Sequence, residues 1–322
     1  MSKHPHLRAI GLRAAIVALV GCCVLAIGVL VLHQLGFDVE RRLWLAKVQL
    51  LGREPVGIWR ADERLGWSHI PGASGRQREV PDFDVSYHID ADGRRDTPGA
   101  PTGARGAVLF LGGSFTFGHG VEDAEPYPAL LQQYWPEREC INAGVNAWGT
   151  TQALLKLQDE LATGRQYDLV VYGFIGHHIS RNYVRRDWLE ILQGGRGRRN
   201  PWFELEDERL VFQGLADPAR DGRAGTAALR VRELEITRRL LSEMSALCKS
   251  HSVRFTVVHL ADGNANVDGA LLTEPLGAQQ VIDLRPELPF DEMRFEHNGH
   301  YTAAGHRLVA EALRERLSAL LP

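Results

Sequence analysis

Four short apolar runs recur from residue 107 onward, and each is bounded by turn residues. They are "AVLFLG" (107–112), "CINAGV" (140–145), "DLVVYGFI" (168–175) and "RFTVVHL" (254–260). Runs of this length without polar alternation are typical of strands that are buried on both faces, as in parallel sheets. Stretches with helical spacing lie between them. Because strands that alternate with helices build a covered parallel sheet, we predict an α/β three-layer sandwich with a mainly parallel central sheet.

Three longer segments carry apolar residues at helical spacing. They cover residues 150–162, 226–249 and 303–321. Each is long enough to form an amphipathic helix that packs on one face of a sheet. The stretch "PWFELEDERLVFQG" (201–214) instead has two strand-like halves around a polar turn, and we predict an inserted hairpin there.

The N-terminus has a different character. Residues 14–32, "AAIVALVGCCVLAIGVLVL", are 19 consecutive uncharged and mostly apolar residues. At about 1.5 Å per residue, a helix of this length nearly spans a hydrocarbon core of about 30 Å. We therefore predict one uncleaved transmembrane helix within residues 1–33, with a cleaved signal peptide as the alternative. The short basic tail favours export of the remainder to the periplasmic side, although basic residues also follow the span.

Composition divides the rest of the chain in two. Residues 34–104 begin with an amphipathic stretch at 36–51, which we expect to be a juxtamembrane helix. The remainder of this segment is rich in Gly, Pro and Asp, and we expect it to form a small β-rich preamble. Residues 105–322 carry the alternation of strands and helices and are expected to form the main α/β domain.

Charge and motif content exclude several classes of function. The formal net charge is -3, and no long basic run is present, which argues against a nucleic-acid partner. No GK[ST] follows a glycine-rich turn and no HExxH or CxxC occurs, so we expect no phosphate loop, no metal and no cofactor. Cys140 and Cys248 could pair in an oxidising compartment, and the sequence leaves both this pairing and the oligomeric state open.

Two polar residues next to these elements have the chemistry of a nucleophile and its base. In "VLFLGGSFTFGHG" (108–120), two glycines let the backbone turn after the strand, which would expose the hydroxyl of Ser114 and leave neighbouring amides free. His300, in "EHNGHYTAAGH", lies directly before the last helix. Taken alone, Ser114 could be a turn or cap residue and His300 a cap or surface residue.

The combination is more specific than either part. "LFLGGSFTFGHGV", "NAGVNAWGTTQ" and "NGHYTAAGHRLVAEAL" occur in this order along the chain. This set resembles the SGNH-hydrolase superfamily, also called GDSL-type esterases and lipases, over roughly residues 107–320. The upstream "LGWSHIPG" and "DADGRRDT" are similar to the preamble of its membrane-anchored bacterial members. The resemblance implies a flavodoxin-like fold and an SGNH-hydrolase-like catalytic domain at 105–322.

The resemblance also assigns roles to single residues. Ser114 matches the family's nucleophile, and His300 matches the catalytic base. The backbone amides of Ser114 and Ala147 match the donors to the oxyanion, with Gly144 as a competitor for the position of Ala147. Because an amide needs no particular side chain, alanine is compatible with this role if the turn is kept.

Two positions depart from the family pattern. In "FIGHHISRN", His177 stands where the family has an oxyanion-binding asparagine; an imidazole N–H could donate the same bond, and the alternative is a plain polar loop. The residues that come after it, which could position substrate or brace the loop, are His178, Arg181 and Asn182.

The second departure lies beside the base, where many family members have an aspartate. This chain has Asn298 there, which can accept a hydrogen bond but supplies no counter-charge to an imidazolium. The orienting group for His300 is therefore Asn298, a carboxylate such as Glu296 or Asp291, or a backbone carbonyl in a Ser–His dyad.

These features together favour a membrane-anchored serine esterase or acylhydrolase. By analogy with the family, its substrate would be an extracytoplasmic ester-bearing small molecule, carbohydrate (glycan) or lipid. Two alternatives stay open. The acyl-enzyme could pass its acyl group to an envelope glycan, as an O-acyltransferase, or the two departures could mark a catalytically weakened binding module.

Overall fold

The computed structural model describes residues 19–21, 28, 57–101, 103–263 and 267–322. Contacts divide the chain into Met1–Gly52 and Arg53–Pro322, and the second unit contains the central sheet. The predicted transmembrane span at 14–32 lies outside the described residues except for residues 19–21 and 28, and the predicted helix at 36–51 lies outside them entirely. Within the described residues, no helix combines the length and the hydropathy needed to cross a membrane.

A five-stranded parallel sheet forms the centre of the second unit, as the apolar runs predicted. Its strands are β5 (Gly106–Gly112), β6 (Arg138–Asn142), β7 (Leu169–Phe174), β10 (Arg254–His259) and β11 (Val281–Asp283). Their spatial order is β11-β10-β7-β5-β6, so the chain crosses over β5 on its way from β6 to β7. In sheets of this order, ligands bind beyond the carboxyl ends of the strands on either side of that switch point. β11 was not predicted, because three half-buried residues ending in an aspartate do not make an apolar run.

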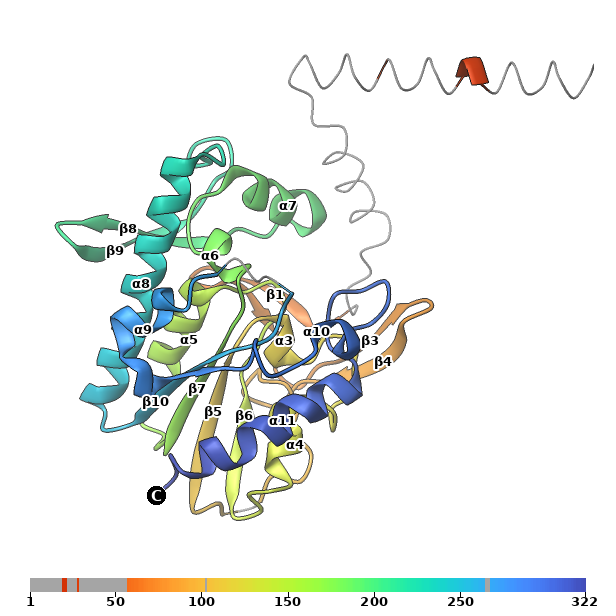
Figure 1. The fold of residues 1–322 in the computed structure, drawn as a ribbon, viewed down its shortest axis with the longest axis vertical. Coiled ribbons are helices and arrows are strands. Elements are labelled where there is room, and N and C mark those ends of the chain that lie inside the picture. The colour runs from red at the N-terminus through yellow and green to blue at the C-terminus, as the bar shows by residue number, and fades with distance from the viewer. Residues whose placement is uncertain (1–18, 22–27, 29–56, 102, 264–266) are drawn as a thin grey trace, which may run out of the picture. The chain divides into compact units, whose positions relative to one another are not determined.

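Helices cover both faces of the sheet and give the predicted three layers (Figure 1), and one hydrophobic cluster lies on each face. Side chains alternate along β5: Leu109 and Leu111 enter one cluster, and Val108 and Phe110 enter the other. The first cluster includes residues of α5 (Thr150–Ala162), α8 (Ala227–Ser250) and α9 (Ala270–Leu276). The second includes residues of α4 (Tyr127–Gln132) and α11 (Ala303–Ser318).

The three helices predicted between and after the strands of the sheet and the inserted hairpin are present. α5 has the predicted bounds, α8 begins after Thr226, whose hydroxyl accepts from the Leu229 amide, and α11 begins after Thr302. The hairpin consists of β8 (Pro201–Glu206) and β9 (Arg209–Leu215). The remaining elements of this part are α3 (Ser114–Phe117), α6 (His178–Arg181), α7 (Arg186–Arg196), a 3-10 helix at Ala278–Gln280 and α10 (Phe290–Met293).

Cys140 and Cys248 are both free and buried. Cys140 belongs to the hydrophobic cluster on one face of the sheet and Cys248 to the cluster on the other face. Because the sheet separates the two thiols, no disulfide joins them, which answers the question that the sequence left open.

The segment before the sheet folds into two antiparallel hairpins within the same compact unit. They consist of β1 (Trp59–Asp62) with β2 (Gly66–His69), and β3 (Ser74–Glu79) with β4 (Phe83–His88). A third apolar cluster joins them to α3 and contains Phe83, Tyr87 and Phe117. The buried Arg95 lies over the rings of Tyr87 and Phe117 and donates to the carbonyls of Phe117, Gly118 and Val121. The hairpins and Arg95 therefore pack against the residues that follow Ser114 and fix their position.

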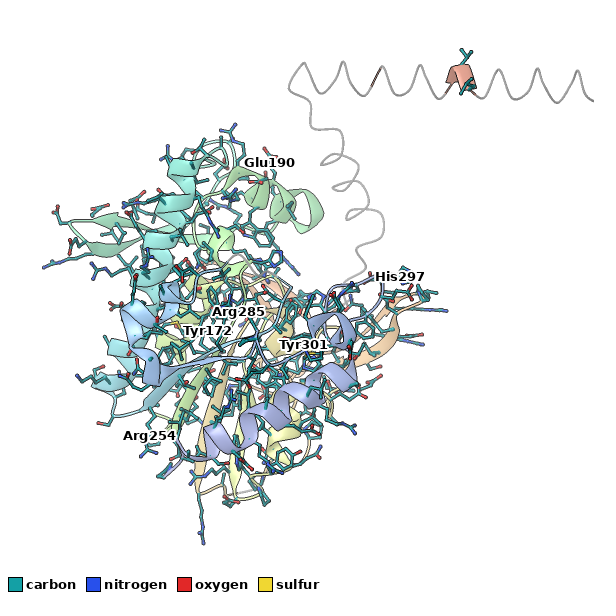
Figure 2. All side chains as sticks on the ribbon, viewed as in Figure 1. Tyr172, Glu190, Arg254, Arg285, His297 and Tyr301 are labelled. Atoms are coloured by element: carbon teal, nitrogen blue, oxygen red, sulfur yellow. The ribbon has the colours of Figure 1, made fainter. Side chains whose placement is uncertain are left out.

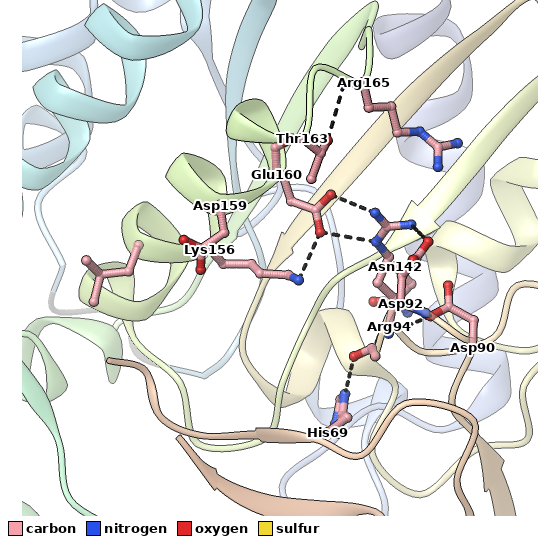
Figure 3. Close-up of polar contacts among 12 residues, drawn as sticks. His69, Asp90, Asp92, Arg94, Asn142, Lys156, Asp159, Glu160, Thr163 and Arg165 are labelled. Atoms are coloured by element: carbon pink, nitrogen blue, oxygen red, sulfur yellow. Dashed lines mark hydrogen bonds and ion pairs between the residues drawn. The ribbon is translucent and has the colours of Figure 1, made fainter. Parts of the chain in front are cut away.

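A buried ion cluster makes a second connection between this segment and the sheet region (Figure 3). Arg94 donates from Nε to Glu160 Oε1 at 3.1 Å and from Nη2 to Oε2 at 2.8 Å, and Lys156 Nζ lies 2.9 Å from Oε1. Asp92 accepts from the third nitrogen of Arg94 at 2.9 Å. Burial alone would raise the pKa of Glu160, but the hydrogen bonds and charges of Arg94 and Lys156 outweigh it and lower the pKa to about 2.

Candidate active site

Ser114 lies at the turn directly after β5. Gly113 is the N-cap residue of α3, and Ser114 is the first residue of that short helix. A Cβ on Gly112 would collide with Thr116 Oγ1, and one on Gly113 would lie 3.1 Å from the Trp148 carbonyl oxygen. Only glycines therefore allow so tight a turn. It places the serine at the carboxyl end of β5, beside the switch point of the sheet.

His300 meets Ser114 across this edge of the sheet. Its Nε2 lies 2.7 Å from Ser114 Oγ, although the two residues are 186 positions apart. The loop that carries His300 is closed on itself before α11, since the Phe295 amide donates to the His300 carbonyl at 3.0 Å. The imidazole packs against Phe115 and His119, with ring centroids 5.1 and 4.3 Å away. The nucleophile and base that the sequence suggested are thus brought into hydrogen-bond contact.

Asn298 is the orienting group that contacts His300. Its Oδ1 lies 2.5 Å from His300 Nδ1 and accepts the His300 backbone N–H at 3.1 Å. An amide oxygen only accepts, so the imidazole carries its proton on Nδ1 and leaves Nε2 free to accept the serine proton. The amide nitrogen of Asn298 donates to Glu79 Oε2 at 3.0 Å.

The two local carboxylates considered from the sequence point elsewhere. Asp291 is exposed and accepts from Arg294 Nε at 3.2 Å. Glu296 is also exposed, and neither carboxylate contacts the ring of His300 among the described residues. The carboxylate at this site is Glu79, 219 residues from Asn298. Sequence reasoning missed it, because a contact over such a distance leaves no local pattern.

The electrostatic surroundings keep His300 neutral at neutral pH. Desolvation of the ring holds the pKa of His300 well below its usual range, and His119, Arg181, His306 and His177 lower it further. Burial also lowers the pKa of the neighbouring His119, to about 4. A neutral imidazole is the form that can accept a proton from a serine hydroxyl.

The loop after β6 offers the backbone amide expected of an oxyanion site. Ala147 has φ +68, the left-handed conformation that glycine adopts most easily, so the turn is kept although the residue is alanine. Its amide donates to no group among the described residues. The amide of the competitor Gly144 is already bonded to Asn142 Oδ1 at 3.1 Å, and a Cβ there would lie 2.5 Å from the Phe117 nitrogen. Gly144 therefore serves packing, and Ala147 has the available donor.

The two histidines at the start of α6 have different environments. His177 is exposed, and its Nδ1 lies 3.8 Å from Asp262 Oδ2. His178 is buried, with Nδ1 2.7 Å from the Tyr172 hydroxyl. Its Nε2 has no partner among the described residues and would lie 2.9 Å from a Cβ on Gly113. Of the two, His178 is the one packed against the turn that carries the serine.

Arg181 and Asn182 also separate into two roles. Arg181 Nη1 donates to the Trp148 carbonyl at 3.2 Å, its guanidinium lies over the Trp188 ring, and burial lowers its pKa to about 10. Asn182 is fully buried; its Oδ1 accepts the Thr150 amide at 2.7 Å, and its Nδ2 donates to Thr150 Oγ1 at 2.9 Å. Asn182 therefore braces the start of α5, whereas Arg181 brings a positive charge to the loops around Ser114.

Among the residues described, no group of three or more His, Cys, Asp or Glu side chains is placed to hold a metal ion. The histidines around the serine are divided between ring contacts and hydrogen bonds to the protein. The arrangement of a serine hydroxyl, a neutral imidazole and free amides at one edge of the sheet is suited to nucleophilic attack on a carbonyl carbon.

Comparison with known proteins gives matches among solved structures only. No family model and no curated protein matches the chain. One match is the structure of TesA, at 16% identity over 67% of this chain and 99% of that chain, with a TM-score of 0.43. Another is a lipolytic protein of the G-D-S-L family from Desulfitobacterium hafniense DCB-2, at 12% identity over 65% and 98%, with a TM-score of 0.40. A variant of an acetyl xylan esterase from Geobacillus stearothermophilus matches at 14% identity over 66% and 95%, with a TM-score of 0.37.

Proposed function

We propose that this chain is a serine hydrolase of the SGNH superfamily that cleaves carboxylic esters through an acyl-enzyme on Ser114. The observation that carries the proposal is the unbroken set of contacts from Ser114 Oγ to His300 Nε2 at 2.7 Å and from His300 Nδ1 to Asn298 Oδ1 at 2.5 Å. The order of "LFLGGSFTFGHGV", "NAGVNAWGTTQ" and "NGHYTAAGHRLVAEAL" along the chain supports the proposed superfamily.

The contacts define a two-step reaction. His300 Nε2 takes the proton of Ser114 as the serine oxygen attacks the ester carbonyl, which forms a tetrahedral oxyanion. Collapse of this intermediate breaks the bond to the alcohol oxygen, and His300 returns the proton to the leaving alcohol. Water then attacks the acyl-enzyme, with His300 as base again, and releases the carboxylic acid and free Ser114.

Backbone amides are the proposed donors to the oxyanion. The Ser114 amide is at the first position of α3, where it has no acceptor within the helix, and the Ala147 amide donates to no other described group. The guanidinium of Arg181 adds positive charge near the oxyanion. Its Nη1 lies close to Gly113, the residue before Ser114, since a Cβ built on Gly113 would be 3.8 Å away. His177 stays a predicted third donor, whose ring contacts Asp262.

The setting and substrate of the reaction are proposed from the sequence. We propose that residues 14–32 anchor the protein in a membrane and that the catalytic domain acts on the periplasmic side on a carbohydrate or lipid ester. Fractionation of cells that express the full chain, followed by protease treatment of the periplasmic face, tests this. Recovery of the intact chain in the cytosol would overturn both parts.

Labelling by a fluorophosphonate tests the chemistry directly, because this probe reacts with activated serines. The full chain in detergent should be labelled and should hydrolyse p-nitrophenyl acetate. Ser114→Ala should lose both, whereas Ser250→Ala, at the exposed end of α8, should lose neither. Absence of Ser114-dependent labelling and hydrolysis would overturn the proposal in favour of a binding module. If labelling occurs and added glycans become acylated, the acyl-enzyme passes its acyl group to the glycan instead of to water.

A further inference from the structure

The loop that carries His300 is held from outside by the end of the β3–β4 hairpin. Asp82 lies in the turn and accepts from the backbone N of His297 at 3.1 Å and from its Nδ1 at 3.1 Å. Phe83 packs on Phe295 with ring centroids 5.3 Å apart. Figure 2 shows His297 beside this hairpin. Glu79, the last residue of β3, completes the contact by accepting from Asn298 Nδ2 at 3.0 Å.

The direction of the Asn298 amide determines whether His300 can act as a base. With Oδ1 toward the imidazole, Nδ1 keeps its proton and Nε2 accepts from Ser114. In the flipped amide, an NH₂ group would face both the ring and the backbone N–H of His300. The ring would then move its proton to Nε2 and could no longer take one from the serine. A carboxylate on the far side of Asn298 excludes this flip, because a carboxylate accepts and the amide oxygen cannot donate to it.

Glu79 also supplies the negative charge that Asn298 lacks. It forms no ion pair among the residues that the structure describes, so its only strong polar contact there is the Asn298 amide. An amide that donates to a carboxylate is polarised and becomes a better acceptor at its oxygen. The charge therefore acts on His300 Nδ1–H through a single intervening side chain.

We propose that Glu79 is a positioning residue of this active site, which acts through Asn298 to fix the tautomer of His300 and to stabilise its imidazolium form. The Ser–His–Asn contacts are thereby extended to a carboxylate from the N-terminal segment, and the β3–β4 hairpin becomes part of the active site. This inference rests on the proposed function and names a residue that the resemblance to the family does not supply.

Several other titratable groups lie around the same elements. The interactions of His119, Arg181, His306 and His177 with His300 all lower the pKa of His300. On the hairpin, Arg76 and Arg78 pair with Asp84, and Asp82 pairs with His297. Glu79 is thus the one carboxylate that touches Asn298 among the described residues, and its removal should leave the positive charge of Arg181 near His300 less compensated.

The pH dependence of ester hydrolysis by the full chain in detergent tests the role of Glu79. For Glu79→Gln, kcat should fall about 10-fold or more, a smaller loss than the roughly 10⁴-fold loss for removing a carboxylate in direct contact with a catalytic histidine. KM should change little. The acidic limb of kcat/KM should move to lower pH, because loss of a negative charge lowers the pKa of His300.

Two control variants on the same hairpin separate this effect from loop anchoring and from net charge. Asp82→Asn weakens the contact to His297 and should lower activity without moving the acidic limb. Asp84→Asn removes a carboxylate paired with Arg76 and should leave kcat and the pH profile as in the unaltered protein. A Glu79→Gln profile that matches the unaltered protein, or that loses activity without a shift of the limb, would overturn the inference.

Relocation of the carboxylate provides a rescue experiment. Asn298→Asp alone would place two carboxylates about 3 Å apart, and such a pair shares one proton. The double variant Glu79→Gln with Asn298→Asp avoids this, because it puts one carboxylate directly on His300 and a donor amide behind it. Its kcat should exceed that of Glu79→Gln by about 10-fold or more.

The outcomes also distinguish this inference from the proposed function. If the double variant is no faster than Glu79→Gln while Ser114-dependent labelling persists, Glu79 is only a structural residue and the esterase proposal stands. If the unaltered protein shows no Ser114-dependent labelling, the proposed function fails first. Both are supported if labelling of Glu79→Gln is slower, its acidic limb lies at lower pH, and labelling is still abolished by Ser114→Ala.

Discussion

Two of the polar connections between residues 57–101 and the α/β region differ in how their charges are met. In the Arg94–Glu160 cluster, each charge has an opposite charge within 3.1 Å, and both side chains are buried. In the chain from Glu79 to Ser114, a single carboxylate is followed by an amide, a neutral imidazole and a hydroxyl. In the first connection the charges neutralise one another. The second connection ends at the hydroxyl of Ser114, which can react.

The difference indicates what each connection contributes. Removing one partner of a buried ion pair leaves an uncompensated charge and is strongly destabilising, so variants of the Arg94 cluster should act on stability. The chain from Glu79 to Ser114 has only one full charge, and the neutral, low-pKa imidazole of His300 can accept the proton of the Ser114 hydroxyl through Nε2. Groups of this kind are retained for reactivity instead of stability. Variants along the two connections test whether stability and activity separate in this way.

The largest effect should come from removing the base. His300→Ala should lower the rate of ester hydrolysis about 10³-fold or more, because proton transfer by a positioned base and activation of the serine are both lost. The free energy of unfolding should change by only about 1 kcal/mol. Steady-state kinetics and urea unfolding of the same preparation measure the two quantities. If His300→Ala lost much stability but kept normal activity, the contacts from Glu79 to Ser114 would serve stability and not reactivity.

The Arg94 cluster should show the opposite pattern. Glu160→Gln leaves the buried guanidinium of Arg94 with only the exposed Asp92 and leaves Lys156 without its carboxylate, so it should lower the free energy of unfolding by about 3 to 5 kcal/mol. Activity per folded molecule should be unchanged. Asp159→Asn is the matched control, because Asp159 lies next to Glu160 on α5 but forms an exposed pair with Arg64. This variant should cost about 1 kcal/mol or less. Equal losses for the two variants would show that burial of the pair is irrelevant.

Acid should destabilise the protein through the same carboxylate. The pKa of Glu160 is about 2 in the folded protein, and a glutamate in an unfolded chain titrates near 4.3, so its folded pKa is depressed. The stabilisation is therefore complete above about pH 4.3 and is lost as the pH falls toward 2. Thermal unfolding from pH 6 to pH 2 should show a smaller decrease for Glu160→Gln than for the unaltered protein. Parallel decreases would refute the assignment.

The smallest effect concerns the loop that offers the oxyanion amide. Ala147 holds a left-handed conformation that glycine adopts without strain, so Ala147→Gly should raise the free energy of unfolding by about 1 kcal/mol. kcat should stay within about 2-fold, because the amide is retained. Ala153→Gly, inside α5, is the control and should lower stability instead. A loss of stability in Ala147→Gly would mean that packing of its methyl group outweighs the backbone strain.

The local parts of the fold and site could be predicted from the sequence. The apolar runs predicted β5, β6, β7 and β10, and the glycines around Ser114 predicted a sharp turn at the end of β5. These features depend on residues close together in the chain, such as side-chain periodicity and the absence of a Cβ. β11 escaped prediction because it owes its place to pairing with β10, not to a pattern of its own.

The site itself shows the same division. The order of three motifs was enough to single out Ser114 and His300, and the sequence identified Asn298 and His177 as the positions that depart from the family. It could not decide between Asn298, Glu296 and Asp291, because all three lie within nine residues of the histidine and the fold determines which side chain points at the ring.

The sequence by itself therefore determined the parallel sheet, the reactive serine turn and the histidine before the last helix, since periodicity, glycine content and motif order are local properties. Only the tertiary structure decided which carboxylate stands behind His300. Glu79 and Asn298 are 219 residues apart and meet because the β3–β4 hairpin packs against the loop before α11. Contacts of that kind are set by packing, which no short stretch of sequence encodes.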